Sequence, residues 1–145
     1  MITIHKINDP LYVKELLQRD SLYQDIWPTI TDLTLMVPDM QSIAWFEVTK
    51  YYATIGILFI KEHTDNCVYF HGGMFKEYRN INTVNILKDC LTQLHILLPG
   101  YVFATTINSK NIPAINLIKK IGCVHQGTIK NGYKTGDLMI FSEVE

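Results

Sequence analysis

The fold of this chain is constrained most by three consecutive runs rich in aromatic and β-branched residues. One long amphipathic segment follows them. The runs cover residues 44–49, 54–62 and 66–75, and their composition predicts an antiparallel meander of three strands. The third run contains Gly72 and Gly73 side by side. Because glycine weakens a regular strand, this pair predicts a bulge or a place where a ligand approaches the backbone closely.

The long amphipathic segment that follows covers residues 80–98 and predicts a helix. Pro99-Gly100 marks its end. Its apolar residues recur at spacings of three and four: Ile81, Val84, Leu87, Leu91, Leu94 and Leu98. A strand over 101–107 comes next. A second helix is expected over 110–121, with Ser109 as its N-cap and Gly122 as its terminator.

The two ends of the chain complete the element order. Residues 2–7 alternate as in a short strand, and Asp9-Pro10 is typical of a helix start. Residues 21–40 predict a short helix and a loop. At the other end, two strands over 123–129 and 137–144 are expected to flank a turn at Asn131-Gly132. This order predicts a single α/β domain over 1–145, with a central mixed sheet of six to seven strands flanked by about four helices.

Composition excludes several classes of protein. The 145 residues are 48% hydrophobic and 19% charged, which is typical of a globular chain, and the formal net charge of −1 disfavours nucleic acid as a partner. The cysteines, Cys67, Cys90 and Cys123, are odd in number and widely spaced, so reduced thiols are expected. The first ten residues lack the pattern of a signal peptide, and no apolar run approaches the ~20 residues of a membrane span. A cytoplasmic protein without a membrane partner is therefore expected.

Two motifs resemble those of the GCN5-related N-acetyltransferase (GNAT) superfamily. They are Glu77-Tyr78-Arg79 before the long helix, and Asn111-x-x-Ala114-x-x-Leu117-x-x-x-x-Gly122 in the second helix. The resemblance covers residues 44–141. It implies that 44–145 form the core sheet with the cofactor motifs, and that 1–43 supply an N-terminal strand and substrate-side helices. His71, Glu77-Tyr78-Arg79 and Asn111-x-Pro113-Ala114 also resemble GNAT-like proteins encoded among phage head-assembly genes.

The resemblance implies an acetyl-CoA-dependent N-acyltransferase in which an unidentified small-molecule or protein amine attacks the thioester directly. His71 is the candidate catalytic base, and a backbone N–H near Met74 is the candidate donor to the oxyanion. A bulge at Gly72-Gly73 would separate the strand that contains them from the strand over 101–107. The pantetheine arm of the cofactor could then pair with the exposed edge of the glycine-containing strand. Pyrophosphate would bind at the start of the long helix. The implied cofactor-binding residues are Gly72, Gly73, Met74, Arg79, Asn80, Ile81, Asn82, Thr83, Val84, Asn85 and Asn111.

The chain departs from the family pattern at four positions. Asn82 and Val84 replace the usual glycines of the phosphate loop, Ile118 replaces the tyrosine that often protonates the thiolate, and Cys123 replaces a phenylalanine. These departures leave open whether acetyl-CoA is still bound. The alternative is a catalytically degenerate GNAT-fold phage structural or head-assembly protein, in the host cytoplasm or the virion, with itself or virion proteins as partners. A third reading is a protein that binds CoA without transferring its acyl group.

Several residues have a structural explanation beside the functional one. His71 is either the base or a histidine bonded within a sheet, and Arg79 either binds phosphate or pairs with an acid such as Glu77. Asn80, Asn82 and Asn85 suit helix capping as well as phosphate binding, and Asn111 either holds the loop before its helix or touches the cofactor. The five histidines show no i, i+4 ligand spacing, so no metal site is expected.

Overall fold

The computed structural model describes residues 1–28, 30–79 and 82–144. Within these residues, seven strands form one mixed sheet in the order β1-β2-β3-β4-β5-β7-β6. The strands are β1 (Ile2–Ile7), β2 (Ile43–Lys50), β3 (Ala53–Glu62), β4 (Cys67–Met74), β5 (Val102–Asn108), β6 (Val124–Tyr133) and β7 (Gly136–Ser142). The helices that flank the sheet are α1 (Pro10–Gln18), α2 (Leu22–Ile26), α3 (Thr83–Leu97) and α4 (Ile112–Lys120), with short 3-10 turns at Arg19–Ser21 and Lys76–Tyr78.

The chain divides into two compact units, each built from separate stretches of sequence. The first unit comprises residues 1–61 and 71–81, and the second comprises 62–70 and 82–145. Strand β4 contributes to both, because its residues 67–70 belong to the second unit and its residues 71–74 to the first. Each unit is described by itself below.

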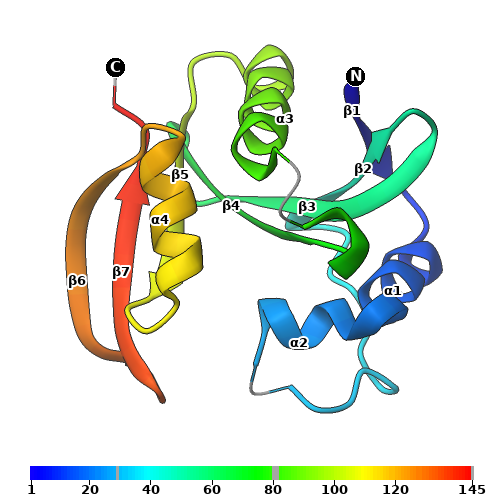
Figure 1. The fold of residues 1–145 in the computed structure, drawn as a ribbon, viewed down its shortest axis with the longest axis horizontal. Helices are drawn as coiled ribbons and strands as arrows, with labels where there is room; N and C mark the ends of the chain where they lie inside the picture. The colour runs from blue at the N-terminus through cyan, green and yellow to red at the C-terminus, as the bar shows by residue number, and fades with distance from the viewer. Residues whose placement is uncertain (29, 80–81, 145) are drawn as a thin grey trace. The chain divides into compact units, whose positions relative to one another are not determined.

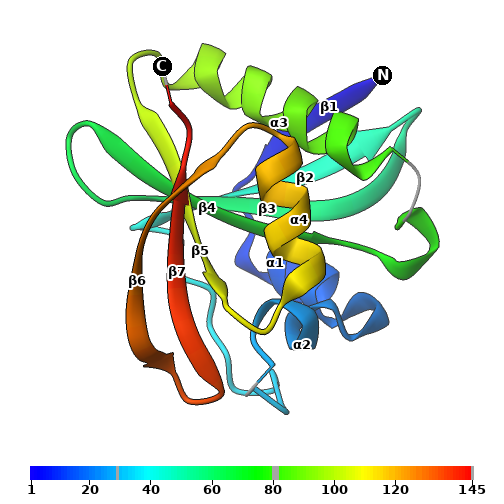
Figure 2. The ribbon, with the colours of Figure 1, turned by 60° about the vertical axis from the view of Figure 1, so that its left-hand side comes forward.

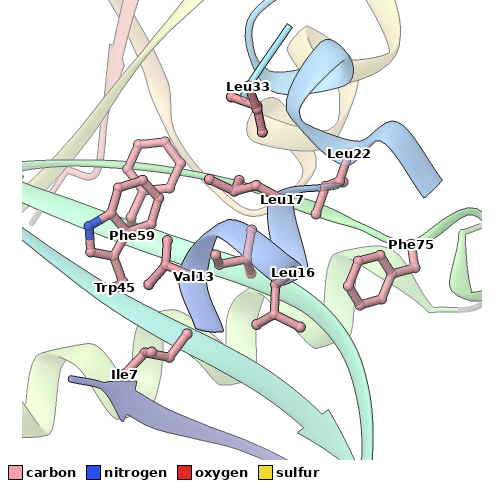
Figure 3. Close-up of a cluster of buried hydrophobic side chains, with 10 residues drawn as sticks. Ile7, Val13, Leu16, Leu17, Leu22, Leu33, Trp45, Phe59 and Phe75 are labelled. Atoms are coloured by element: carbon pink, nitrogen blue, oxygen red, sulfur yellow. The ribbon is translucent and has the colours of Figure 1, made fainter. Parts of the chain in front are cut away.

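The first unit is an antiparallel meander covered by the two N-terminal helices. β1 pairs with β2 from Ile2 opposite Lys50 to Ile7 opposite Trp45, and β2 continues antiparallel onto β3. α1 and α2 follow one another in space as well as in sequence (Figure 1). Side chains from α1 lie over those of β2 and β3 (Figure 3), and the cluster they form is buried: Ile7, Val13, Leu16, Leu17, Leu22, Leu33, Trp45, Ile57, Phe59 and Phe75.

Local sequence explains the position of α1. Asp9 caps it, because the Asp9 carboxylate accepts a hydrogen bond from the Leu11 N–H at 2.9 Å. Pro10 occupies the first turn, where its missing N–H costs nothing. Val13, Leu16 and Leu17 then fall on one face, at helical spacing, and all three are buried. The helix is therefore anchored at its start by a cap and along its length by apolar burial.

The second unit contains the parallel part of the sheet and the C-terminal hairpin. β4 pairs in parallel with β5 from Cys67 opposite Val102 to Tyr69 opposite Ala104. β7 lies between β5 and β6 and is antiparallel to both (Figure 2). α3 buries Ile86, Cys90, Leu91 and Leu94, and α4 buries Ile115 and Ile118.

Most of the elements expected from the sequence are confirmed, with corrections at helix and strand ends. The cap of α4 is Asn111, whose side-chain oxygen accepts from the Ala114 N–H at 3.3 Å, and not Ser109. Asn131-Gly132 lies inside β6 at a register irregularity, and the hairpin turn falls at residues 134–135. Asn131 adopts the positive φ that suits asparagine, 56°, but it does so in a bulge.

The long helix starts later than predicted. Its first helical residue is Thr83, and Asn82 before it has a left-handed backbone with φ 51°. Asn80 and Ile81, which the sequence places at the helix start, lie outside the described residues. The end of α4 follows the expected pattern, since Gly122 has φ 101° and its N–H donates to the Lys119 carbonyl.

Candidate functional site

Strand β4 carries four predicted residues of the first unit, His71 to Met74, in one continuous segment. Successive side chains of a strand point to opposite faces, so His71, Gly73 and Phe75 share one face and Gly72 and Met74 the other. The first face is covered by α2, because a Cβ built on Gly73 would lie 2.8 Å from Leu22 Cδ1. Phe75 is fully buried in the cluster formed with α1 and α2.

His71 is half-buried and is held among aromatic rings. Its imidazole centroid lies 5.6 Å from that of Phe59, whose ring in turn lies 5.7 Å from Trp27 and 4.7 Å from Trp45. Burial disfavours the charged imidazolium and lowers the pKa of His71 below its usual 6.5. The neutral imidazole, which is able to accept a proton, is therefore the form that this environment favours near neutral pH.

The main chain of β4 is oriented by its pairing with β3. The Phe75 N–H donates to the Ile55 carbonyl at 2.9 Å, so the polar groups of Phe75 point toward β3. Hydrogen-bonding direction alternates along an antiparallel strand, so the N–H and C=O of Met74, and those of Gly72, point away from β3. A strand in this orientation offers backbone donors and acceptors along the side that β3 does not use.

The backbones of β3 and β4 approach each other too closely for a side chain at Gly56 or Gly72. A Cβ added at Gly56 would lie 2.4 Å from the Gly73 oxygen, and one at Gly72 would lie 2.4 Å from the Ile57 oxygen. Glycine is therefore required at both positions by packing between strands. The bulge predicted at Gly72-Gly73 stays a prediction.

Arg79 is engaged by protein groups in the first unit. Its Nε donates to the Met74 carbonyl at 2.9 Å, and its Nη2 lies 2.5 Å from the Asp25 carboxylate on α2. Of the two explanations the sequence allowed, the ion pair is observed, but with Asp25 in place of Glu77. Glu77 instead pairs with Arg19 at 3.4 Å.

Asp25 and Arg19 were not predicted from the sequence to contribute to this region. Both lie in or next to the stretch that carries no motif, and Asp25 is 54 positions from Arg79. The Arg19 guanidinium also stacks 4.2 Å above the Phe75 ring. Contacts of such long sequence separation leave no local pattern that could have revealed them.

The start of α3 carries the predicted phosphate-binding residues of the second unit. The Asn82 side chain makes no capping hydrogen bond, in contrast with Asp9 at α1 and Asn111 at α4. The first backbone N–H groups of a helix have no partner within the helix, and the positive end of the helix dipole lies there. Thr83 and Val84 are half-buried and Asn85 is exposed.

The other predicted residues of the second unit have structural roles. The Asn111 side chain caps α4 through the Ala114 N–H. Ile118 is 5% exposed and packs in the core, so an aliphatic side chain occupies the position of the tyrosine that the resemblance led us to look for. Cofactor contact by Asn111 stays a prediction.

The thiols are not arranged for nucleophilic chemistry. Burial raises the pKa of Cys90 to about 12 and that of Cys123 to about 11, and burial also raises the pKa of Cys67. Thiolate is the reactive form, so all three cysteines are poor nucleophiles in the folded protein.

Within residues 1–28, 30–79 and 82–144, no three His, Cys, Asp or Glu side chains gather into a group that could hold a metal ion. No helix of the described chain has both the length and the apolar character needed to cross a bilayer.

A shallow pocket of about 260 Å³ in the second unit contains none of the predicted residues. Glu143 in its lining accepts from the Phe103 N–H at 3.1 Å and lies 2.8 Å from His95 Nε2. The lining residues are His95, Gly100, Tyr101, Val102, Glu143 and Val144.

Comparison with known proteins gives a result at the level of structure alone. No family model matches the sequence, and no curated protein matches it. Solved structures match over almost the whole chain. The aminoglycoside acetyltransferase AAC(6')-Ib in complex with paromomycin and acetyl-CoA superposes with a TM-score of 0.75, at 17% identity, over 99% of this chain and 93% of that one.

Two further structures with different acceptors match equally well. The spermidine N-acetyltransferase of Vibrio cholerae in complex with CoA and spermine gives a TM-score of 0.75, at 13% identity, over 97% of this chain and 94% of that one. The ribosomal-protein-S5-alanine acetyltransferase of Vibrio fischeri gives 0.75, at 11% identity, over 99% and 92%. Three acetyltransferases with unlike acceptors therefore share one architecture with this chain, which has the GNAT acyl-CoA N-acyltransferase fold.

Proposed function

We propose that the protein is an acetyl-CoA-dependent N-acyltransferase acting on an amine. The observation that carries the proposal is the organisation of β4. One strand presents a half-buried histidine with a lowered pKa and, three residues later, a Met74 N–H that points away from β3. The shared fold with acetyltransferases solved with acetyl-CoA or CoA supports the same class of chemistry.

The residues of this chain fit the thioester substrate in three respects. The free N–H groups at the start of α3 and its dipole suit a pyrophosphate. The N–H and C=O of Gly72, which point away from β3, suit an amide of a pantetheine arm, because such an arm can add to a strand edge as a further strand does. The Met74 carbonyl already accepts from Arg79. The Asn82 side chain leaves the helix start uncapped, so no protein oxygen from that residue competes there.

His71 would remove the proton that the amine must lose. An alkyl amine has a pKa of about 10.4 and is mostly protonated at pH 7, so a neutral imidazole is the required partner. The Met74 N–H would donate to the oxygen that becomes negative when the amine attacks the thioester carbonyl. The departing thiolate must then be protonated by a group other than residue 118, which is isoleucine. Direct attack by the amine agrees with the high pKa of the buried thiols.

The test combines binding and transfer. Calorimetric titration with acetyl-CoA should give saturable heat, and release of free thiol should follow addition of an amine from a panel of alkyl, aryl and peptide amines. His71→Gln should retain binding and lose most of the transfer, because proton abstraction typically contributes ~10²- to 10⁴-fold. The exposed His5 on β1 gives the matched control, His5→Asn, which should transfer at the wild-type rate. No heat at millimolar acetyl-CoA would reject the proposal.

A second candidate is a protein of this fold that has lost catalysis, such as a phage structural or head-assembly protein. It is favoured by the buried Ile118, which offers no proton to a leaving thiolate. In that case no amine in the panel would be acetylated, and Val84→Gly would leave the function unchanged. An enzyme would instead change its affinity for acetyl-CoA, because Val84 lies in the first turn of α3.

A further inference from the structure

Arg79 is attached to β4 and α2 at the same time. Its Nε bonds the Met74 carbonyl at 2.9 Å, and its Nη2 meets the Asp25 carboxylate at 2.5 Å. A guanidinium is planar, so fixing two of its nitrogens fixes the orientation of the whole group. The Met74 carbonyl is thus connected through one planar guanidinium group to a carboxylate of α2.

This contact acts on the peptide group that joins Met74 to Phe75. The N–H of that peptide belongs to Phe75 and donates to the Ile55 carbonyl at 2.9 Å, while its C=O belongs to Met74 and accepts from Arg79. Both polar ends of the same peptide plane are therefore held, one by β3 and one by Arg79. Peptide groups are planar and stiff, so the bond from Arg79 limits rotation of the chain at Met74.

The Met74 N–H points to the same side of the strand as the Met74 carbonyl, because both groups of one residue face the same way in a strand. By holding the Met74 carbonyl, the guanidinium therefore also limits the direction in which the Met74 N–H points. A donor of this kind contributes to catalysis only when its direction matches the place where charge develops.

We infer that Arg79 is a positioning residue for acyl transfer: it orients the Met74 N–H by holding the Met74 carbonyl, and Asp25 in turn holds Arg79. This inference rests on the proposed function. It differs from the expectation that Arg79 binds the phosphates of the cofactor, since two of the guanidinium nitrogens are already engaged by protein oxygens.

A neighbouring arginine offers a matched control. Arg19 pairs with Glu77 at the longer distance of 3.4 Å, with side chains 43% and 61% exposed, and its guanidinium stacks on the Phe75 ring. The Arg79–Asp25 pair is also exposed, at 37% and 44%, and exposed pairs contribute little to stability. The two arginines therefore differ chiefly in the bond that Arg79 makes to the Met74 carbonyl. Arg19→Gln therefore removes a positive charge from the same unit and leaves the Met74 carbonyl in place.

Steady-state kinetics separate the two roles of Arg79. Arg79→Gln should lower kcat about tenfold and leave the KM for acetyl-CoA unchanged within about twofold, because the donor is misdirected while the substrate still binds. Asp25→Asn should lower kcat in the same direction by at most about fivefold, and Arg19→Gln should match the wild type. A raised KM for acetyl-CoA at constant kcat would overturn the inference in favour of phosphate binding, and unchanged kinetics would overturn both roles. If Arg79→Gln fails to fold, Arg79→Lys, which keeps the charge and loses the fork, should show the same kcat loss.

A second measurement does not depend on activity. A through-bond NMR coupling between Arg79 Nε and the Met74 carbonyl carbon should be present in the wild type and in Arg19→Gln, and weakened in Asp25→Asn. If wild-type transfer is absent but the coupling is found, the proposed function fails and the contact survives. If transfer is present and the coupling is absent, the positioning role fails alone.

Discussion

His71 has a pKa below 6.5 because its environment disfavours the charged ring. In the unfolded chain the imidazole takes up a proton near its ordinary pKa, and in the folded chain it does so only at lower pH. Between these two values the unfolded state binds more protons, so the free energy of unfolding falls as pH falls. The contribution of neutral His71 to stability is complete above pH 6.5. It is lost as the pH falls through the lowered pKa of the folded state.

Replacing His71 should therefore flatten part of the pH dependence of stability. We expect the difference in melting temperature between the wild type and His71→Gln to shrink or reverse as pH is lowered from 7.5 to 5, because the variant has no imidazole to titrate. Differential scanning calorimetry of both proteins at matched ionic strength measures this difference in melting temperature. His5→Asn should follow the wild-type curve, and a constant difference between wild type and His71→Gln over this range would contradict the assigned pKa direction.

Residue roles were only partly predictable from the sequence. His71 was recognised as a candidate because it stands beside Gly72. Arg79 was recognised because it belongs to the Glu77-Tyr78-Arg79 motif. The partner of Arg79 was not predicted, since Asp25 lies 54 positions away on a short helix without a pattern of its own. A side-chain contact that depends on how α2 packs against β4 cannot be predicted from the local sequence.

At the scale of elements, the close approach of β3 and β4 distinguishes two adjacent glycines. A Cβ at Gly72 would meet backbone atoms, with the Ile57 oxygen at 2.4 Å, whereas a Cβ at Gly73 would meet the tip of the Leu22 side chain at 2.8 Å. Backbone in a paired strand cannot move without breaking the ladder, but a leucine methyl group can rotate away.

Gly72→Ala should consequently destabilise the protein by about 2 kcal/mol or more, and Gly73→Ala by about 1 kcal/mol or less. Urea denaturation of both variants, followed by circular dichroism, gives the two free energies of unfolding on one scale. Equal losses at the two positions would show that the β3 and β4 backbones are free to separate.

The elements themselves were mostly predictable, because strand alternation and helix periodicity are local. The final hairpin was the main exception. Asn131-Gly132 indicated a positive φ, and Asn131 does adopt one, but positive φ serves a bulge as well as a turn. The register is instead fixed by pairs such as Ile129 opposite Leu138 and Tyr133 opposite Gly136, which depend on partners across the strand.

At the scale of the whole molecule, each unit depends on two separated stretches of chain. The second unit takes residues 62–70 from the middle of the sequence, and these include Cys67–Tyr69, which pair with β5. A fragment of residues 82–145 would leave one side of β5 without its parallel partner. Single-domain organisation was expected from length and stays a prediction.

The fragment 82–145 should therefore fail to unfold cooperatively on heating, whereas 62–145, which contains every stretch of the second unit, should show a cooperative transition. Heat capacity and amide chemical-shift dispersion distinguish the two. A sharp transition in the shorter fragment would show that Val102–Ala104 do not need β4.

The interleaving of the two units also limits how such a protein can change in evolution. The chain passes from one unit to the other after residues 61, 70 and 81. A crossover between two related genes at any one of these junctions, or anywhere between them, brings together parts of a unit from different parents. Exchange by recombination is thus penalised throughout this stretch.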